Sequence, residues 1–156
     1  EKTKDSTTKK WGTAHSVDFN QELNAREEIK IKLFLAHHQE LKMDSVKSES
    51  GLRFMRYCHG IGPDLAKVGQ EAIVRVKIEL LDGRVCYETA KGEIERVVIA
   101  KSEKETGIHE ALQLMMKGDK AKLILPSYLG HGLLGDRMKI PPQSVLYIDL
   151  QLIDLK

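Results

Sequence analysis

The chain's 156 residues are enough for one domain with a hydrophobic core and some extension. Basic and acidic residues nearly cancel, 25 against 23, and neither sign forms a block, so the sequence lacks the charge profile of a nucleic-acid-binding protein. No apolar run reaches the length needed to span a membrane. The chain starts at Glu1 without a Met, so we expect a processed or trimmed form, in which a lost signal peptide or lipid anchor would leave no trace.

The N-terminal third is predicted to be a tail followed by a helical extension. Residues 1–16 are polar and rich in Lys, Thr and Ser, which is typical of a flexible tail, and residues 17–49 form the extension. A helix is expected over residues 18–41, with Asp18 as its N-cap. Its apolar stripe has a period close to 3.6 and comprises Phe19, Leu23, Ile29, Leu33 and Ala36. This surface must be covered, either by the chain's own domain or by a second copy in a homodimer.

Period-two alternation then predicts strands over residues 50–58 and 71–80. The second is the clearer, with its inward positions at Val74, Val76, Ile78 and Leu80. Asp82-Gly83 predicts a turn, and two shorter extended segments follow at 84–89 and 94–100. The two cysteines, Cys58 and Cys86, make no disulfide framework, and we favour two separate half-buried thiols over a bridge.

A short amphipathic helix follows these strands. Thr106 is its expected cap and Gly118 its expected left-handed C-terminal residue, and its stripe comprises Ile108, Ala111, Leu112 and Met115. Strands at 120–125 and 144–155 flank a Gly-rich loop over 126–139. About five mostly antiparallel strands crossed by one short helix indicate an α+β fold.

Ordered short motifs along residues 50–156 resemble the FKBP-type peptidyl-prolyl cis-trans isomerases. The motifs are Ser50-Gly51-Leu52, Gly60-x-Gly62, Lys67-x-Gly69, Asp82-Gly83, Gly107, Glu110-Ala111, Gly118, Leu125-Pro126-Ser127, Ile140-Pro141-Pro142 and Asp149. The helix leading into SGLRF, together with GLLGD, is most similar to bacterial envelope FKBP lipoproteins of the gliding-motility type. The resemblance implies a strongly twisted antiparallel half-barrel sheet wrapped on the short helix. The N-terminal extension lies outside this common domain.

The resemblance also implies an activity. Rotation about an Xaa-Pro bond takes tens to hundreds of seconds without a catalyst, because amide resonance is lost on twisting. FKBP-type enzymes use an apolar pocket that desolvates the prolyl amide and binds its twisted form, with no metal or cofactor. We therefore expect proline-containing polypeptide substrates, weak binding of macrolide inhibitors, and a folding role in the periplasm of a bacterial cell envelope.

Most of the family's pocket positions carry other residues in this chain. The family's strand Tyr falls at Val76, its Phe-Asp pair at Cys86-Tyr87, its pre-helix apolar pair at Lys104-Glu105, its Trp at Ile108, its loop Tyr at His131 and its last-strand Phe at Ile148, while its Ile before Pro-Pro is kept as Ile140. The resemblance assigns catalytic positions to Tyr87, His131 and Ile140 and substrate-binding positions to Val76, Cys86, Ile108 and Ile148. A one-residue shift would instead place Tyr87 at the Phe position.

These substitutions leave two functions open. The pocket could retain isomerase activity at a reduced level, or it could bind peptides or proteins without turnover, as a chaperone or assembly module. His131 likewise has two interpretations, a donor to the substrate carbonyl at the pocket rim or a loop histidine in solvent.

Overall fold

The computed structural model describes residues 16–43 and 49–156, so most of the predicted tail lies outside it. Its helices are α2 (Ser16–Ala36), α3 (Thr106–Leu112) and the short 3-10 helix η2 (Ser127–Leu129). Its strands are β1 (Arg53–Cys58), β2 (Glu71–Leu80), β3 (Val85–Glu88), β4 (Glu95–Val98), β5 (Lys120–Leu125) and β6 (Leu146–Leu155).

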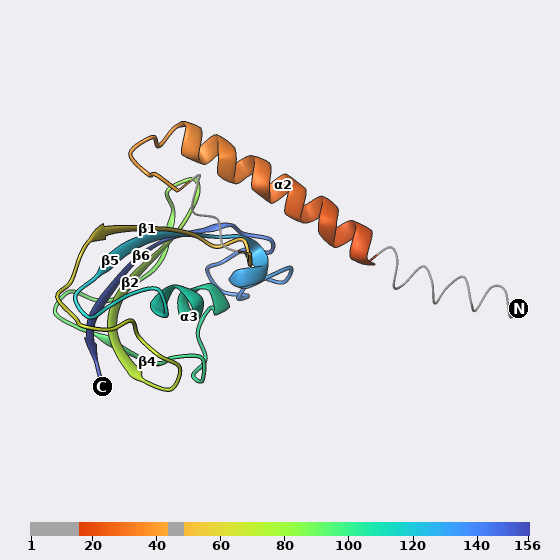
Figure 1. Ribbon diagram of the computed structural model, residues 1–156. Coiled ribbons are helices and arrows are strands. Elements are labelled where there is room, and N and C mark those ends of the chain that lie inside the picture. Colours follow the sequence, from red (N-terminus) through yellow and green to blue (C-terminus); the bar gives the residue numbers. More distant parts are fainter. Residues whose placement is uncertain (1–15, 44–48) are drawn as a thin grey trace, which may run out of the picture.

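The six strands form one antiparallel sheet in the order β1-β5-β6-β2-β3, with β4 also paired to β2. β3 and β4 occupy successive stretches of the same edge of β2, and the long β2–β6 pairing forms the centre of the sheet. The sheet curves around α3, and α2 crosses its other face (Figure 1). The predicted twisted antiparallel α+β architecture is confirmed, with six strands where about five were expected.

The main core lies between the concave face of the sheet and α3. The predicted inward residues of β2 are buried, and buried residues alternate along β6 in the same way. The four apolar residues of the stripe from Ile108 to Met115 are buried as well. The helix is shorter than predicted, because it ends at Leu112. Its N-cap residue is Glu105 rather than Thr106, so it begins one residue earlier than expected. Gly118 has the expected positive φ of 93°, but it lies in the turn before β5, where its N–H donates to the carbonyl of Leu152 at 2.7 Å.

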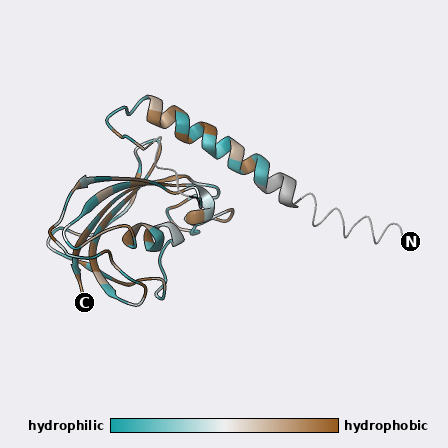
Figure 2. Cartoon of the chain, in the orientation of Figure 1, coloured by the Kyte–Doolittle hydropathy of each residue, from teal (hydrophilic) through white to brown (hydrophobic). Residues whose placement is uncertain are grey.

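Helix α2 packs on the opposite face of the sheet and builds a second, smaller core. Ile31 and Leu35 join Leu41, Met43, Ile124 and Val145 in this cluster. The predicted stripe is wrong in part, because Ile29 and Leu33 are 59% and 58% exposed. The helix has apolar residues on several faces (Figure 2), and the face that meets the sheet is the one that carries Leu23, Ile31 and Leu35.

Polar contacts fix α2 to the domain. Glu27 is only 4% exposed, and its carboxylate accepts hydrogen bonds from the Ser127 N–H at 2.7 Å and the Ser127 hydroxyl at 2.5 Å. The carboxylate of Glu28, the next residue of the helix, pairs with Arg53 at the start of β1. These contacts join the extension to both η2 and the sheet. None of the helices in the described part of the chain is both long and apolar enough to cross a bilayer.

Candidate functional site

A cavity of about 570 Å³ opens where β2, β3 and β4 meet the start of α3 and the loop after η2. Its lining combines apolar side chains of the sheet with a polar rim and comprises Val76, Ile78, Val85, Cys86, Tyr87, Glu88, Glu95, Lys104, Glu105, His131, Asp136 and Lys139. Four of the residues assigned from the sequence therefore line one cavity: Val76, Cys86, Tyr87 and His131. The pre-helix pair Lys104-Glu105 lies on the same cavity.

The other three assigned residues lie in the core. Ile108, Ile140 and Ile148 are between 0% and 2% exposed and do not belong to the lining of the cavity. They pack in the same cluster as Val76 and Cys86, which do line it. From this position the three side chains can support the wall of the cavity. Their direct contact with a substrate stays a prediction.

Tyr87 is linked to the loop that precedes Ile140. Its hydroxyl donates to Asp136 Oδ2, while Asp136 Oδ1 accepts from the backbone N–H groups of Met138, Lys139 and Ile140 at 2.8–2.9 Å. Burial acts to raise the pKa of Asp136, but the Tyr87 hydroxyl and these N–H donors outweigh it and hold that pKa well below its usual range. The same hydrogen bond raises the pKa of Tyr87. The Tyr87 ring, with Lys139 Nζ 5.1 Å from its centroid, thus lies against an ordered loop.

His131 faces a carboxylate across the cavity mouth. Its Nε2 lies 2.7 Å from Glu105 Oε2, and its side chain is 29% exposed. The Glu105 side chain is only 8% exposed, and its second oxygen, Oε1, is buried without a hydrogen-bond partner among the described residues. His131 is therefore neither a histidine free in solvent nor one whose ring nitrogens are both open to a substrate.

A second ion pair lies on the β4 side of the cavity. Glu95 accepts from Lys104 Nζ at 3.1 Å and from the hydroxyl of Thr89. Burial acts to raise the pKa of Glu95, but these two donors lower it below its ordinary value. Glu95 is thus a carboxylate whose charge is matched within the protein.

Both cysteines are free thiols, Cys58 exposed and Cys86 buried. Burial is the main cause of the raised pKa of Cys86, so its thiol stays protonated at neutral pH and acts as a small apolar wall. Its sulfur lies 3.5 Å from the carbonyl oxygen of Lys139. This contact also brings β3 against the loop before Ile140.

Sequence reasoning missed much of the polar rim, including Asp136, Lys139, Glu95 and Glu88. One signal could have identified Asp136: it follows Gly135 in a loop, and Asp in such positions often accepts hydrogen bonds from the next backbone N–H groups. The pairing of Tyr87 with Asp136 had no local signal, because 49 positions separate the two residues.

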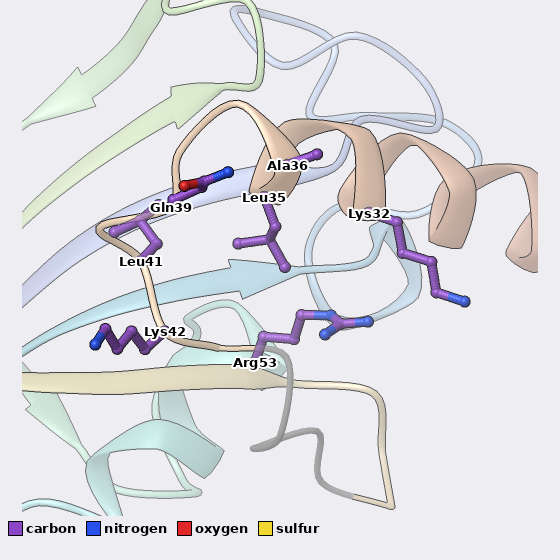
Figure 3. A pocket seen from close by; sticks show the side chains of 7 residues that line it. All are labelled: Lys32, Leu35, Ala36, Gln39, Leu41, Lys42 and Arg53. Carbon is purple, nitrogen blue, oxygen red and sulfur yellow. The ribbon is translucent and has the colours of Figure 1, made fainter.

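A larger cavity of about 690 Å³ lies between α2 and β1 (Figure 3) and is lined by Lys32, Leu35, Ala36, Gln39, Leu41, Lys42 and Arg53. None of the residues assigned from the sequence lies there. The guanidinium of Arg53 is used internally, since it pairs with Glu28 and donates to the carbonyl of Met43 at 3.4 Å. We therefore place the candidate site in the smaller cavity, where separate elements bring together apolar walls and polar groups.

Comparisons with known proteins agree with this fold. Residues 62–153 match the family described as FKBP-type peptidyl-prolyl cis-trans isomerase. The macrophage infectivity potentiator of Trypanosoma cruzi is 34% identical over 113 residues, which are 72% of this chain and 57% of that protein. The FKBP-type peptidyl-prolyl cis-trans isomerase FkpA of Buchnera aphidicola is 30% identical over 129 residues, 82% of this chain and 50% of that protein.

The crystal structure of FkpA from Escherichia coli superposes with a TM-score of 0.70 at 25% identity, covering 99% of this chain and 70% of that one. The chain thus belongs to the FKBP-type peptidyl-prolyl cis-trans isomerase family, as its motifs predicted. It spans about half the length of the curated relatives that it matches. The narrower likeness to gliding-motility lipoproteins stays a prediction.

Proposed function

We propose that the protein catalyses cis–trans isomerisation of Xaa-Pro bonds and thereby assists protein folding, with the 570 Å³ cavity as its active site. The observation that supports this most is the convergence of Val76, Cys86, Tyr87 and His131, assigned to pocket positions from the sequence, on that one cavity. Family membership supports the same reaction.

The proposed mechanism is desolvation with preferential binding of the twisted amide. The proline ring enters against Val76, Ile78 and the Tyr87 ring, where the walls exclude water from the prolyl amide. Loss of water favours the twisted state, because its nitrogen and carbonyl carry less separated charge than the planar amide. The loop fixed by Asp136 keeps Tyr87 in place, so little reorganisation is needed. His131 borders the mouth, and Ile108, Ile140 and Ile148 support the walls.

A protease-coupled assay on an Xaa-Pro peptide tests this proposal. Tyr87→Ala should lower kcat/KM by about tenfold or more, because it removes an aromatic wall that contacts the prolyl ring. Tyr57→Ala is the matched control, since Tyr57 is an exposed tyrosine of β1 outside the cavity lining. Equal rates for the two variants would place the reaction elsewhere, and no acceleration by the unaltered protein at high concentration would reject it.

The alternative function is peptide or protein binding without turnover, as a chaperone or assembly module. It is favoured by Val76 in place of the family's Tyr, and by the engagement of the Tyr87 hydroxyl and His131 within the protein. It predicts peptide binding with little isomerisation, and weak macrolide binding. Restoring the family residues with Val76→Tyr and Tyr87→Asp should then raise the rate, and an unchanged rate counts against this alternative.

We further propose a homodimer through the exposed face of α2. Ile29 and Leu33 lie opposite the buried face of the helix, flanked by exposed Ala25 and Ala36. Light scattering should give twice the chain mass, which Ile29→Glu with Leu33→Glu should halve. Lys30→Glu with Lys32→Glu, on the same helix and also exposed, is the control. A monomer mass for the unaltered chain rejects the dimer.

The proposed location is the bacterial cell envelope, in the periplasm. It is supported by the likeness to envelope FKBP proteins alone. Fractionation of the producing cells tests it, because recovery of the protein in the periplasmic or membrane fraction supports the proposal and recovery in the cytoplasm rejects it.

A further inference from the structure

The candidate cavity carries more negative than positive charge. Its lining contains four carboxylates and two ammonium groups, which are Glu88, Glu95, Glu105, Asp136, Lys104 and Lys139. Glu95 is matched by Lys104, and Asp136 is saturated by donors from its own loop and from Tyr87. Counted over its carboxylates and ammonium groups, the lining carries an excess of two negative charges. A pocket of this kind favours cationic ligands and disfavours acidic ones.

Glu105 is the carboxylate with an unmet hydrogen-bonding capacity. Its side chain is more than nine-tenths buried, Oε2 is bound by His131, and Oε1 has no partner among residues 16–43 and 49–156. A buried carboxylate oxygen without a donor is costly, and native structures rarely leave one unless a ligand or water completes it. The terminal torsion of a glutamate is soft, so a small rotation can bring Oε1 to the cavity that the residue lines.

We infer that the cavity prefers Xaa-Pro segments in which a lysine or arginine adjoins the proline, and that Glu105 is the residue that determines this specificity. The inference rests on the isomerase function proposed above. A lysine ammonium or an arginine guanidinium supplies the donor that Oε1 lacks and reduces the excess of negative charge. A leucine at the same position leaves the oxygen unpaired, and a glutamate adds a further negative charge.

Tetrapeptides Ala-Xaa-Pro-Phe with Xaa as Lys, Arg, Leu or Glu test the preference in the protease-coupled assay. We expect kcat/KM for the Lys and Arg peptides to exceed that for the Leu peptide by roughly tenfold or more, the contribution of a hydrogen bond to a charged group. The Glu peptide should be the poorest. The preference should weaken as salt rises, because the rim charges are partly exposed.

The Glu105→Gln variant should reduce the Lys-to-Leu ratio at least about fivefold, since it removes the charge but keeps the shape of the side chain. Glu103→Gln is the matched control, an exposed glutamate two positions away and outside the lining. A ratio of rates on one protein sample does not depend on the folded fraction. A Leu peptide that equals the Lys peptide, or a ratio unmoved by Glu105→Gln, overturns the inference.

Failure of the proposed isomerase function can be distinguished from failure of the specificity inference. If no peptide is accelerated, that function is rejected, and NMR titration with the same peptides still decides the preference. Tighter binding of the Lys peptide than of the Leu peptide supports the cation-selective cavity, and equal or weaker binding overturns it.

Discussion

Substitution of Glu27 tests how the N-terminal extension is fixed to the rest of the domain. Its buried carboxylate accepts hydrogen bonds from both the N–H and the hydroxyl of Ser127, one hundred positions later in the chain, and so links α2 to η2. Glu27→Ala removes both acceptors and leaves the Ser127 N–H without its partner in a buried setting. Ser127→Ala removes only the hydroxyl contact and keeps the backbone hydrogen bond.

The expected magnitudes follow from these two hydrogen bonds. Hydrogen bonds to charged groups contribute about 1.5–3 kcal/mol each, and part of this is regained when water reaches the opened site, so Glu27→Ala should lower the free energy of unfolding by about 2–4 kcal/mol. Ser127→Ala should cost about 1–2 kcal/mol. In the double variant the losses should be less than additive, because both single changes remove the same hydroxyl contact.

Urea denaturation, monitored by circular dichroism, measures these changes in the free energy of unfolding. Glu22→Ala is the matched control, because Glu22 is exposed on the same helix and pairs with Arg26 across one turn, a contact worth about 0.5 kcal/mol or less. Hydrogen exchange of the α2 amides shows whether the helix alone is released. A Glu27→Ala variant as stable as the Glu22→Ala control would refute the reasoning.

Three further outcomes are expected. Burial acts to raise the pKa of Asp119, but two backbone N–H groups and Arg56 outweigh it and lower that pKa. The ionised Asp119 carboxylate therefore stabilises the fold above about pH 4, and this contribution is lost as the pH falls below that value. Asp119→Asn should flatten the acid limb of a stability–pH profile. Gly60→Ala should destabilise by about 1–3 kcal/mol in thermal unfolding, because the new Cβ would lie 2.0 Å from a backbone carbonyl oxygen. Tyr87→Phe should raise the pKa of Asp136, as followed by carboxyl carbon NMR, and an unchanged value would show that the hydroxyl is not its partner.

The sheet could be predicted because its strands have one face in the core. Apolar and polar residues alternate along β2 and β6, which shows directly that one face of each strand is buried. The ends of both strands were predicted to within about two residues. The face of α2 could not be predicted, since apolar residues surround the helix. The choice of Ile31 over Ile29 for burial is made by the residues of β5 and the loop before β6 that receive it.

The residues that form the walls of the candidate site could be predicted from the sequence, but the hydrogen-bond partners of its polar side chains could not. Val76 and Tyr87 could be assigned because they follow from strand positions within an ordered set of motifs. The partners of the polar groups could not, because Tyr87 meets Asp136 and His131 meets Glu105 only after the chain has folded. The charge of the cavity is the sum of such distant contributions, so the specificity inferred for it required the three-dimensional structure.

Exchange spectroscopy by NMR on an Xaa-Pro peptide tests the central claim most directly, because it observes the prolyl bond without a coupling protease. With a catalytic amount of the protein, cis–trans exchange should appear at mixing times well below the roughly tens to hundreds of seconds of the uncatalysed reaction. The Tyr87→Ala variant should lose most of this exchange. Exchange at the uncatalysed rate with the unaltered protein, at concentrations that saturate peptide binding, would contradict catalysis by this cavity.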